Sequence, residues 1–212
     1  MAHSLSIAMQ SIKSLDDSTE VGSDEPYVLV TAANLAGLIP QVEVTLYGPF
    51  EDTDKGETHA TIVAPAGLPK PIADAINGSP LGRRPFWALD NKTSAPIASP
   101  NDVVFIVSVM ENDDGKPNTL RTLVKLAAVG SLAASSGMAR ATRVQKLIAD
   151  IGGALGTPTG APNFDDVVGT HELVLTAADL VPPANKRRVK TVDFNGGNEG
   201  TFRVAVQMDF VS

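Results

Sequence analysis

The sequence predicts a mainly β protein: an antiparallel β-sandwich into which an α-helical hairpin is inserted. Two patterns predict it, namely short apolar runs that alternate with polar residues, and one basic segment whose apolar residues recur at helical spacing. The 212 residues are 43% hydrophobic and have a mean hydropathy of +0.05, which is typical of a folded globular protein. We expect a single domain over residues 1–212, with the hairpin at residues 116–158.

Strands are expected where apolar residues alternate with polar ones or form short continuous runs. Between residues 201 and 210 every second residue is apolar, which is the pattern of a half-buried strand. Clusters of Gly, Pro, Asn and Asp separate the runs, so we expect short antiparallel strands in a sandwich of about eight strands. The other expected strands lie at residues 5–9, 27–30, 42–46, 103–110 and 173–175.

Two helices are expected in the segment that interrupts the strands. From Val144 to Leu155 apolar residues recur every three or four positions, and glycines followed by Pro158 end the run. A second apolar stripe runs from Leu120 to Leu132. We expect the two helices to cover one end of the sandwich; contact between their apolar faces and a membrane or a partner is the alternative.

Charge is distributed unevenly along the chain. The net charge of −7 argues against nucleic-acid binding. Between residues 115 and 162 six basic residues stand against one acid, so this segment carries +5 and the remainder of the chain carries −12. We expect the basic hairpin to meet an anionic partner through Arg121, Lys125, Arg140, Arg143 and Lys146.

Acidic residues gather in three clusters beside expected strands. The first cluster spans residues 16–25, the second is MENDDG at 110–115, and the third is NFDDVVG at 163–169. If the three clusters meet at one end of the sandwich, the repulsion between their carboxylates favours binding of a cation. Flexible loops with oxygen ligands suit Ca²⁺, which takes six to eight of them. Ordinary solvated turns are the alternative.

The same stretches resemble C-two domains, the calcium- and phospholipid-binding β-sandwiches first defined in protein kinase C. GSDEPYVLV, at residues 22–30, resembles the Ser-Asp-Pro-Tyr-Val signature of their first calcium loop. VFIVSVMENDD at 104–114 resembles the strand that enters their third calcium loop, and DDVVGTHELVLTAADL at 165–180 resembles the segment that leaves it. GTFRVAVQM at 200–208 fits their final strand.

The resemblance implies a C-two-like sandwich with the helical hairpin in its third calcium loop. It also implies a phospholipid surface as the usual target. Ser18 stands where the family carries its first aspartate, so Glu20 or Asp17 has to serve in its place. The calcium ligands that the resemblance implies are Glu20, Asp24, Glu111, Asp113, Asp165 and Asp166.

A separate acidic stretch, EDTDKGE at residues 51–57, is a second candidate metal loop. Alternating acids followed by a glycine are typical of the start of an EF-hand loop, where alternate side chains turn toward one ion. The candidate ligands are Asp52, Asp54 and Glu57. The full twelve-residue pattern is absent, and a solvated turn is the alternative.

Motifs of catalysis are missing from the sequence. The three histidines are scattered, there is no cysteine, and no metalloprotease, nucleophile-elbow or phosphate-binding glycine pattern occurs. We therefore expect a non-enzymatic module that binds calcium and, with it, an anionic membrane surface or protein partner. One alternative is a self-assembling structural protein, a homo-oligomer in which the basic hairpin of one subunit docks on the acidic body of another. The second alternative is a metal-assisted hydrolase.

The N-terminal segment bears on the cellular location. It has neither a charged leader nor a continuous apolar core, and no apolar run reaches the ~18 residues of a membrane span. The expected location is the cytoplasm, and export by a route without a leader is the alternative.

Overall fold

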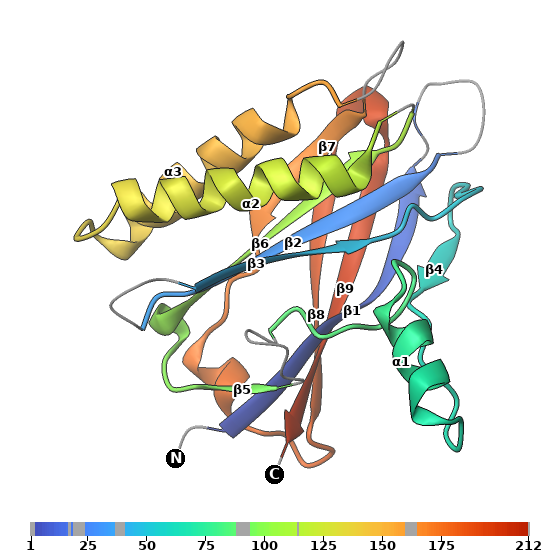
Figure 1. The fold of residues 1–212 in the computed structure, drawn as a ribbon, viewed down its shortest axis with the longest axis horizontal. Coiled ribbons are helices and arrows are strands. Elements are labelled where there is room, and N and C mark those ends of the chain that lie inside the picture. Colours follow the sequence, from blue (N-terminus) through green and yellow to red (C-terminus); the bar gives the residue numbers. More distant parts are fainter. Residues whose placement is uncertain are drawn as a thin grey trace.

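Two antiparallel sheets stack face to face, and a pair of helices lies across the outer face of one of them (Figure 1). The computed structural model describes residues 3–16, 18, 24–36, 41–87, 94–113, 115–159 and 165–211. Within them it is mainly β, as the sequence predicted, and its two sheets are consistent with a β-sandwich. Strands of the two sheets run in clearly different directions in Figure 1.

The five-stranded sheet is built around the first and last strands of the chain. β1 (His3–Asp16) pairs with β9 (Thr201–Val211) from Ser4↔Val211 to Asp16↔Thr201, with an irregularity between Met9 and Ser11. The order of strands is β4-β1-β9-β8, and β5 pairs with the other end of β1. The remaining strands are β4 (Thr58–Ala60), β5 (Ala95–Ile97) and β8 (Arg187–Asn195).

The four-stranded sheet has its two central strands buried on both faces. Its order is β3-β2-β6-β7, with β2 (Pro26–Asn34) and β6 (Val103–Glu111) in the middle. β3 (Gln41–Tyr47) and β7 (Asp166–Glu172) lie at the edges. Every residue of β6 is buried, because one face packs inside the sandwich and the other packs under the helices. This double burial explains why its sequence is an almost continuous apolar run.

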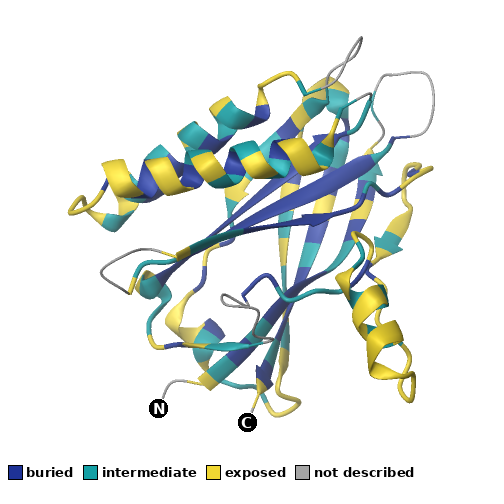
Figure 2. Cartoon of the chain, in the orientation of Figure 1, coloured by how far each residue is buried: buried dark blue, intermediate teal, exposed yellow. Residues whose placement is uncertain are grey.

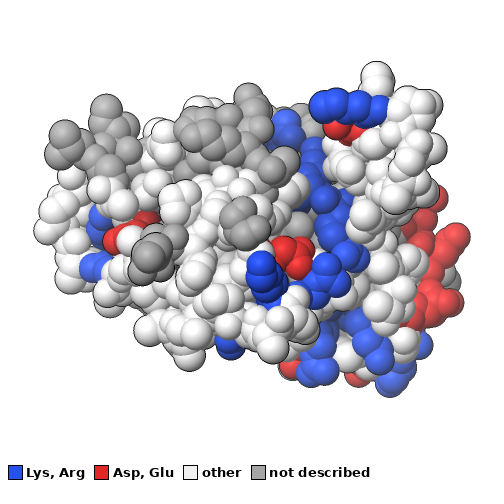
Figure 3. Space-filling model, turned by 90° about the horizontal axis from the view of Figure 1, so that it is seen from below, with Lys and Arg blue, Asp and Glu red and all other residues white. Residues whose placement is uncertain are grey.

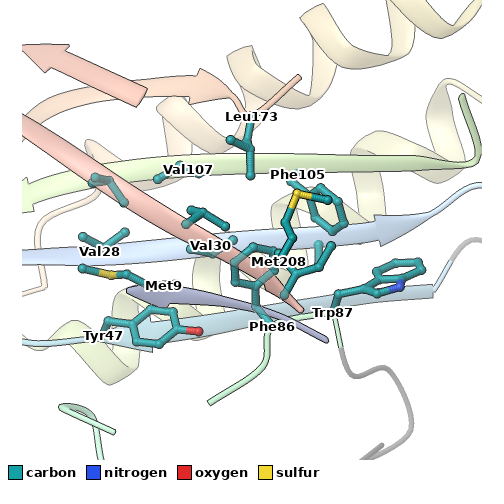
Figure 4. Packing of buried hydrophobic residues seen from close by; sticks show 14 of the residues in the cluster. Met9, Val28, Val30, Tyr47, Phe86, Trp87, Phe105, Val107, Leu173 and Met208 are labelled. Atoms are coloured by element: carbon teal, nitrogen blue, oxygen red, sulfur yellow. The ribbon is translucent and has the colours of Figure 1, made fainter. Parts of the chain in front are cut away.

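The inner faces of the two sheets form the main core. Phe105 lies at its centre, with ring centroids 5.3 Å from Phe86 and 5.5 Å from Trp87 in edge-to-face arrangements. The indole Nε1 of Trp87 donates to the carbonyl of Ala95 at 3.1 Å, so its polar atom is satisfied inside the core. Figure 4 shows these rings beside Met208 and the valines of β2 and β6.

The helical layer buries a second apolar cluster against the outer face of the four-stranded sheet. α2 (Pro117–Ala134) and α3 (Arg140–Leu155) pack on each other and on the sheet. Each turns one apolar stripe toward the strands, and the buried positions form a dark stripe along each helix in Figure 2. The buried apolar residues of the two helices are Leu120, Val124, Ala128, Leu132, Val144, Leu147, Ile151 and Leu155. The helices therefore cover a face of the sandwich, where the sequence suggested an end.

Three expectations about elements were wrong or incomplete. Residues 173–175 are not a strand, because the strand forms earlier, at β7, and ends at Glu172. β8 was missed because only Phe194 among its residues is fully buried, so its apolar pattern is weak. α1 (Lys70–Gly78) was missed as well, since none of its residues is buried. Three short 3₁₀ helices complete the described elements: η2 (Pro100–Asp102), η3 (Ala177–Leu180) and η4 (Gly197–Glu199).

Among the described residues, neither α2 nor any other helix combines the length and the apolar character needed to cross a membrane.

Candidate metal site at the acidic end of the four-stranded sheet

Three chain segments that are distant in sequence reach the same end of the four-stranded sheet. In the register of the strands, Pro26 lies opposite Glu111, and Glu111 lies opposite Asp166. Asp24 therefore stands just before β2 at the end where β6 finishes and β7 begins. The strand register thus brings Glu111 and Asp166 to the end of the four-stranded sheet that Asp24 precedes, whereas Asp16 of the first acidic cluster lies on β1 of the other sheet.

Asp24 is 3% exposed and is held by backbone groups on both sides. Its carboxylate Oδ2 accepts from the backbone N–H of Ser18 at 3.2 Å. Its own carbonyl accepts from the backbone N–H of Thr53 at 2.9 Å, which ties the 51–57 loop to the start of β2. The carboxylate is thus oriented by the backbone fold.

Glu111 ends β6 and is 6% exposed. Its Oε1 accepts from the backbone N–H of Glu25 at 3.2 Å. The Glu25 carboxylate in turn accepts from the side-chain amide of Asn112 at 3.1 Å. The side chains of Glu111, at the end of β6, and Glu25, just before β2, are therefore each held by a donor from the other segment.

Asp165 links the sheet to the segment that precedes α2. One oxygen, Oδ2, accepts from the hydroxyl of Tyr27 at 2.6 Å, and the other, Oδ1, accepts from the backbone N–H of Gly115 at 2.9 Å. Gly115 leaves room for this contact, because a Cβ there would lie 1.9 Å from Oδ1 of Asp165. A side chain at this position would therefore displace the Asp165 carboxylate from this contact.

Tyr27 is fully buried beneath the acidic end. Burial raises the pKa of its hydroxyl far above the usual value, and the hydrogen bond to Asp165 and the charges of Asp165 and Glu111 raise the pKa further. The phenol therefore stays protonated and donates to Asp165 at every ordinary pH. No sequence pattern indicates this role of Tyr27, which stands among the apolar residues of an expected strand.

The six predicted calcium ligands share this end only in part. Asp24, Glu111, Asp165 and Asp166 lie at the strand ends described above, and Asp113 follows β6 by two residues. Glu20 lies outside the described residues. Among the residues that the structure describes, no group of three or more His, Cys, Asp or Glu side chains is arranged to hold a metal ion. The donor set is nevertheless all oxygen, which is the chemistry that Ca²⁺ prefers.

The second candidate loop is closed by its own hydrogen bonds. The backbone N–H of Asp54 donates to the Glu57 carboxylate at 3.1 Å, and the N–H of Glu57 donates to the Asp54 carbonyl at 3.0 Å. Gly56 adopts a φ of 88°, which turns the chain here. The side chains of Asp52, Asp54 and Glu57 are exposed, and this arrangement is that of a solvated turn.

Several basic residues of the hairpin are paired inside the chain. Lys125 bonds Glu43 of β3 at 2.8 Å, Arg140 bonds Glu172 of β7 at 2.6 Å, and Lys146 bonds Asp150 at 2.7 Å. The first two ion pairs fasten the helices to the edge strands of the sheet. Arg121 and Arg143 complete the predicted cationic set, and for them the structure gives no ion pair among the described residues.

Cationic surface also occurs away from the hairpin. Figure 3 shows a band of Lys and Arg side chains across one face, with acidic side chains gathered at its edge. Burial lowers the pKa of Arg83, and the nearby charge of Arg187 lowers it further. The sequence analysis found one basic segment in an otherwise acidic chain. It therefore missed this second basic surface, which side chains from separate segments form.

No known protein family, curated protein or solved structure matches this chain.

Proposed function

We propose that this protein is a non-enzymatic, C-two-like module that binds calcium at the acidic end of its four-stranded sheet. The observation that carries the proposal is the convergence of Asp24, Glu111 and Asp165 from three separate segments. Two of these carboxylates are more than nine-tenths buried, and a buried carboxylate is stabilised by a cation that binds it.

The position of the helices supports the C-two-like interpretation. α2 and α3 connect β6 to β7, so the segment that holds them leaves and re-enters the sheet at the acidic end. In a C-two domain that connection is the third calcium loop. We propose that the hairpin is an insertion in this loop and that it folds back over the outer face of the sheet.

The proposed site has to rearrange when calcium binds. Asp24, Glu111 and Asp165 already accept hydrogen bonds from backbone N–H groups or from Tyr27, and the ion replaces part of these bonds. The chain supplies the ligands and the ion supplies the neutralising charge. For a site that is not preassembled we expect a Kd of about 10⁻⁴ to 10⁻³ M, the range of weak calcium modules.

Calcium is expected to raise the melting temperature. At 10 mM Ca²⁺ the free ion exceeds this Kd by about 10 to 100-fold, which stabilises the folded state by about 1.4 to 2.7 kcal/mol. For a chain of this size the melting temperature then rises by roughly 5 °C relative to a chelator-treated sample. Scanning calorimetry with CaCl₂, MgCl₂ and EDTA measures the shift.

A double variant locates the site that produces this shift. Glu111→Gln combined with Asp165→Asn removes two charges with little change of shape, so the calcium response disappears. The matched control is Asp74→Asn on exposed α1, which leaves the response intact. Equal shifts in wild type and the double variant would contradict the proposed site.

We further propose that the calcium-bound form binds an anionic lipid surface. Calcium at the acidic end of the sheet bridges protein carboxylates and lipid phosphates. This contact does not need the apolar faces of α2 and α3, which are buried against the sheet. Vesicles that contain phosphatidylserine are expected to sediment most of the protein with 5 mM Ca²⁺ and little of it with EDTA. Vesicles of phosphatidylcholine alone are expected to leave it in solution; the same recovery with and without chelator argues against calcium bridging.

A further inference from the structure

Arg84, which follows α1 in the chain, is fastened to the end of the edge strand β3. Its Nη2 atom donates to the carbonyl of Leu46, and its own backbone carbonyl accepts from the hydroxyl of Tyr47. The guanidinium carbon lies 5.9 Å from the centre of the Tyr47 ring. The Nη1 atom donates to the carbonyl of the exposed residue Gly78 at 3.1 Å. These contacts fix the guanidinium at the edge of the four-stranded sheet.

The charge of Arg84 has no carboxylate partner among the residues that the structure describes. Both of its acceptors are neutral carbonyl oxygens, and its buried Nε atom has no hydrogen-bond partner in the described part of the chain. Burial lowers the pKa of the Arg84 guanidinium, and the nearby charge of Arg121 lowers it further. Arginine nevertheless stays charged at every ordinary pH, so Arg84 is a half-buried cation that lacks a counter-charge.

The course of α2 brings Arg121 to the same end of β3. The end of β6 lies beside the start of β2, and the start of β2 pairs with Tyr47, so α2 begins near that end of β3. Lys125 of α2 bonds Glu43 of β3 at 2.8 Å. Arg121 lies one turn before Lys125 on the same face of the helix, and thus nearer to Tyr47. Two arginines from distant segments therefore converge at one edge of the sheet.

The chemistry of the pair selects a ligand. Two like charges at a partly buried position repel each other, and an anion that binds both of them removes this cost. A guanidinium presents its N–H donors as a planar fork, which matches the oxygens of a phosphate group. A phosphate monoester carries about −1.5 to −2 charges at neutral pH, so it balances two arginines, whereas a carboxylate balances one.

The rest of the basic hairpin does not offer the same arrangement. Lys125, Arg140 and Lys146 each bond a carboxylate of the chain. Arg143 is half-exposed like Arg121 and has no ion pair with a described residue. It lies one turn after Arg140, which bonds the carbonyl of Val103 at the start of β6, so Arg143 stands at the opposite end of the sheet from Arg84.

We propose that Arg84 and Arg121 form a binding site for a phosphate group, carried either by a soluble phosphate compound or by a lipid head group. The phosphate oxygens accept hydrogen bonds from both guanidinium groups and link α2 to β3, next to the ion pair of Lys125 and Glu43. The site needs no metal ion. It is therefore tested in EDTA, where its failure and the failure of the calcium site are separate results.

Proton–nitrogen correlation spectra of the full chain observe the Nε–H groups of arginine side chains directly. Titration with inorganic phosphate and with pyrophosphate, at constant ionic strength, is expected to shift the signals of Arg84 and Arg121 until they saturate. Two charge-assisted contacts correspond to a Kd of about 1 mM for inorganic phosphate. Acetate is expected to bind at least about tenfold more weakly, because it can balance only one of the two charges.

Arg121→Gln removes one of the two charges and is expected to weaken phosphate binding about tenfold or more. The matched control is Arg143→Gln, which removes the same charge from the other end of the hairpin and is expected to change the Kd less than about twofold. Arg84→Lys keeps its charge but loses the planar fork, so it is expected to weaken binding as well. Melting in chloride that is the same for Arg121→Gln and wild type shows that the fold is intact.

Vesicles distinguish the two sources of the phosphate group. Vesicles that contain phosphatidic acid and sediment wild type in EDTA, but sediment little of the Arg121→Gln variant, assign the site to a lipid head group. Saturable binding of pyrophosphate without such sedimentation assigns it to a soluble phosphate compound.

The proposal is overturned if inorganic phosphate, pyrophosphate and phosphatidic acid vesicles all fail to bind. An equal loss of binding in Arg143→Gln and Arg121→Gln also overturns it, because the attraction is then general to the basic hairpin. Acetate that binds as tightly as phosphate excludes the phosphate group as the selected ligand.

Discussion

Phe105→Ala is expected to lower the free energy of unfolding by about 4 kcal/mol. The side chain is 1% exposed at the centre of the core, and its removal leaves a cavity and breaks two edge-to-face contacts, with Phe86 and Trp87. Urea unfolding measures this loss of stability. It is followed by the fluorescence of Trp87, the single tryptophan, which lies beside the expected cavity.

Two companion variants control the Phe105 result. Phe105→Leu fills most of the space and is expected to lose less than half as much stability, which keeps the comparison useful if the alanine variant does not fold. Val189→Ala removes an exposed apolar side chain on β8 and is expected to cost less than about 0.5 kcal/mol. A loss at Phe105→Ala no larger than that at Val189→Ala would falsify the central position of this ring.

Asp179→Ala is expected to cost about 3 kcal/mol, because it removes a buried carboxylate that pairs with two half-buried cations and accepts a backbone hydrogen bond. Asp179 is 6% exposed. Its Oδ2 accepts from Lys190 at 2.6 Å and from the backbone N–H of Thr176 at 2.8 Å, and Arg188 lies 3.5 Å from Oδ1. These contacts fasten η3 to β8, an edge strand that buries little apolar surface of its own.

The Asp179 contribution depends on pH with a definite sign. Burial by itself raises the pKa of this carboxyl, but hydrogen bonds from Lys190 and Thr176 outweigh it and hold the pKa below the usual value. The stabilisation is therefore complete above the unfolded pKa of about 3.9 and is lost as the pH falls through the lower, folded pKa. The difference in stability between wild type and Asp179→Asn narrows over that range.

An exposed ion pair serves as the control for Asp179. Arg203 bonds Asp193 at 2.6 Å on the outer surface, where water and salt screen the interaction. Asp193→Asn is therefore expected to change stability little, although Arg203 lowers the pKa of that carboxyl as well. The free energies of unfolding of the Asp179→Asn and Asp193→Asn variants are compared from pH 7 to pH 2.5. An equal loss of stability in both variants would show that burial is not the source of the effect.

The acidic residues of the candidate site could be predicted from the sequence, but the groups that donate hydrogen bonds to them could not. The clusters around Asp24, Glu111 and Asp165 stand out because acidic residues directly beside apolar strands are conspicuous in a sequence. Tyr27 and the backbone N–H groups of Ser18, Glu25 and Gly115 hold these carboxylates, and neither an interior tyrosine nor a backbone group has a sequence signature. Which donor meets which acid depends on the register of β2, β6 and β7.

The sequence by itself determined the elements whose signal is local. Side-chain periodicity predicted β9 from its alternation, β6 from its continuous apolar run, and α2 and α3 from their apolar stripes. Each residue of such an element contributes to the pattern by being apolar or polar. Only the tertiary structure decided that the helices lie on a face of the sheet and that Lys125 and Arg140 form ion pairs with Glu43 and Glu172. It also decided that no residue of α1 is buried. Those outcomes depend on contacts between residues far apart in the chain, and periodicity within one segment carries no information about what covers it.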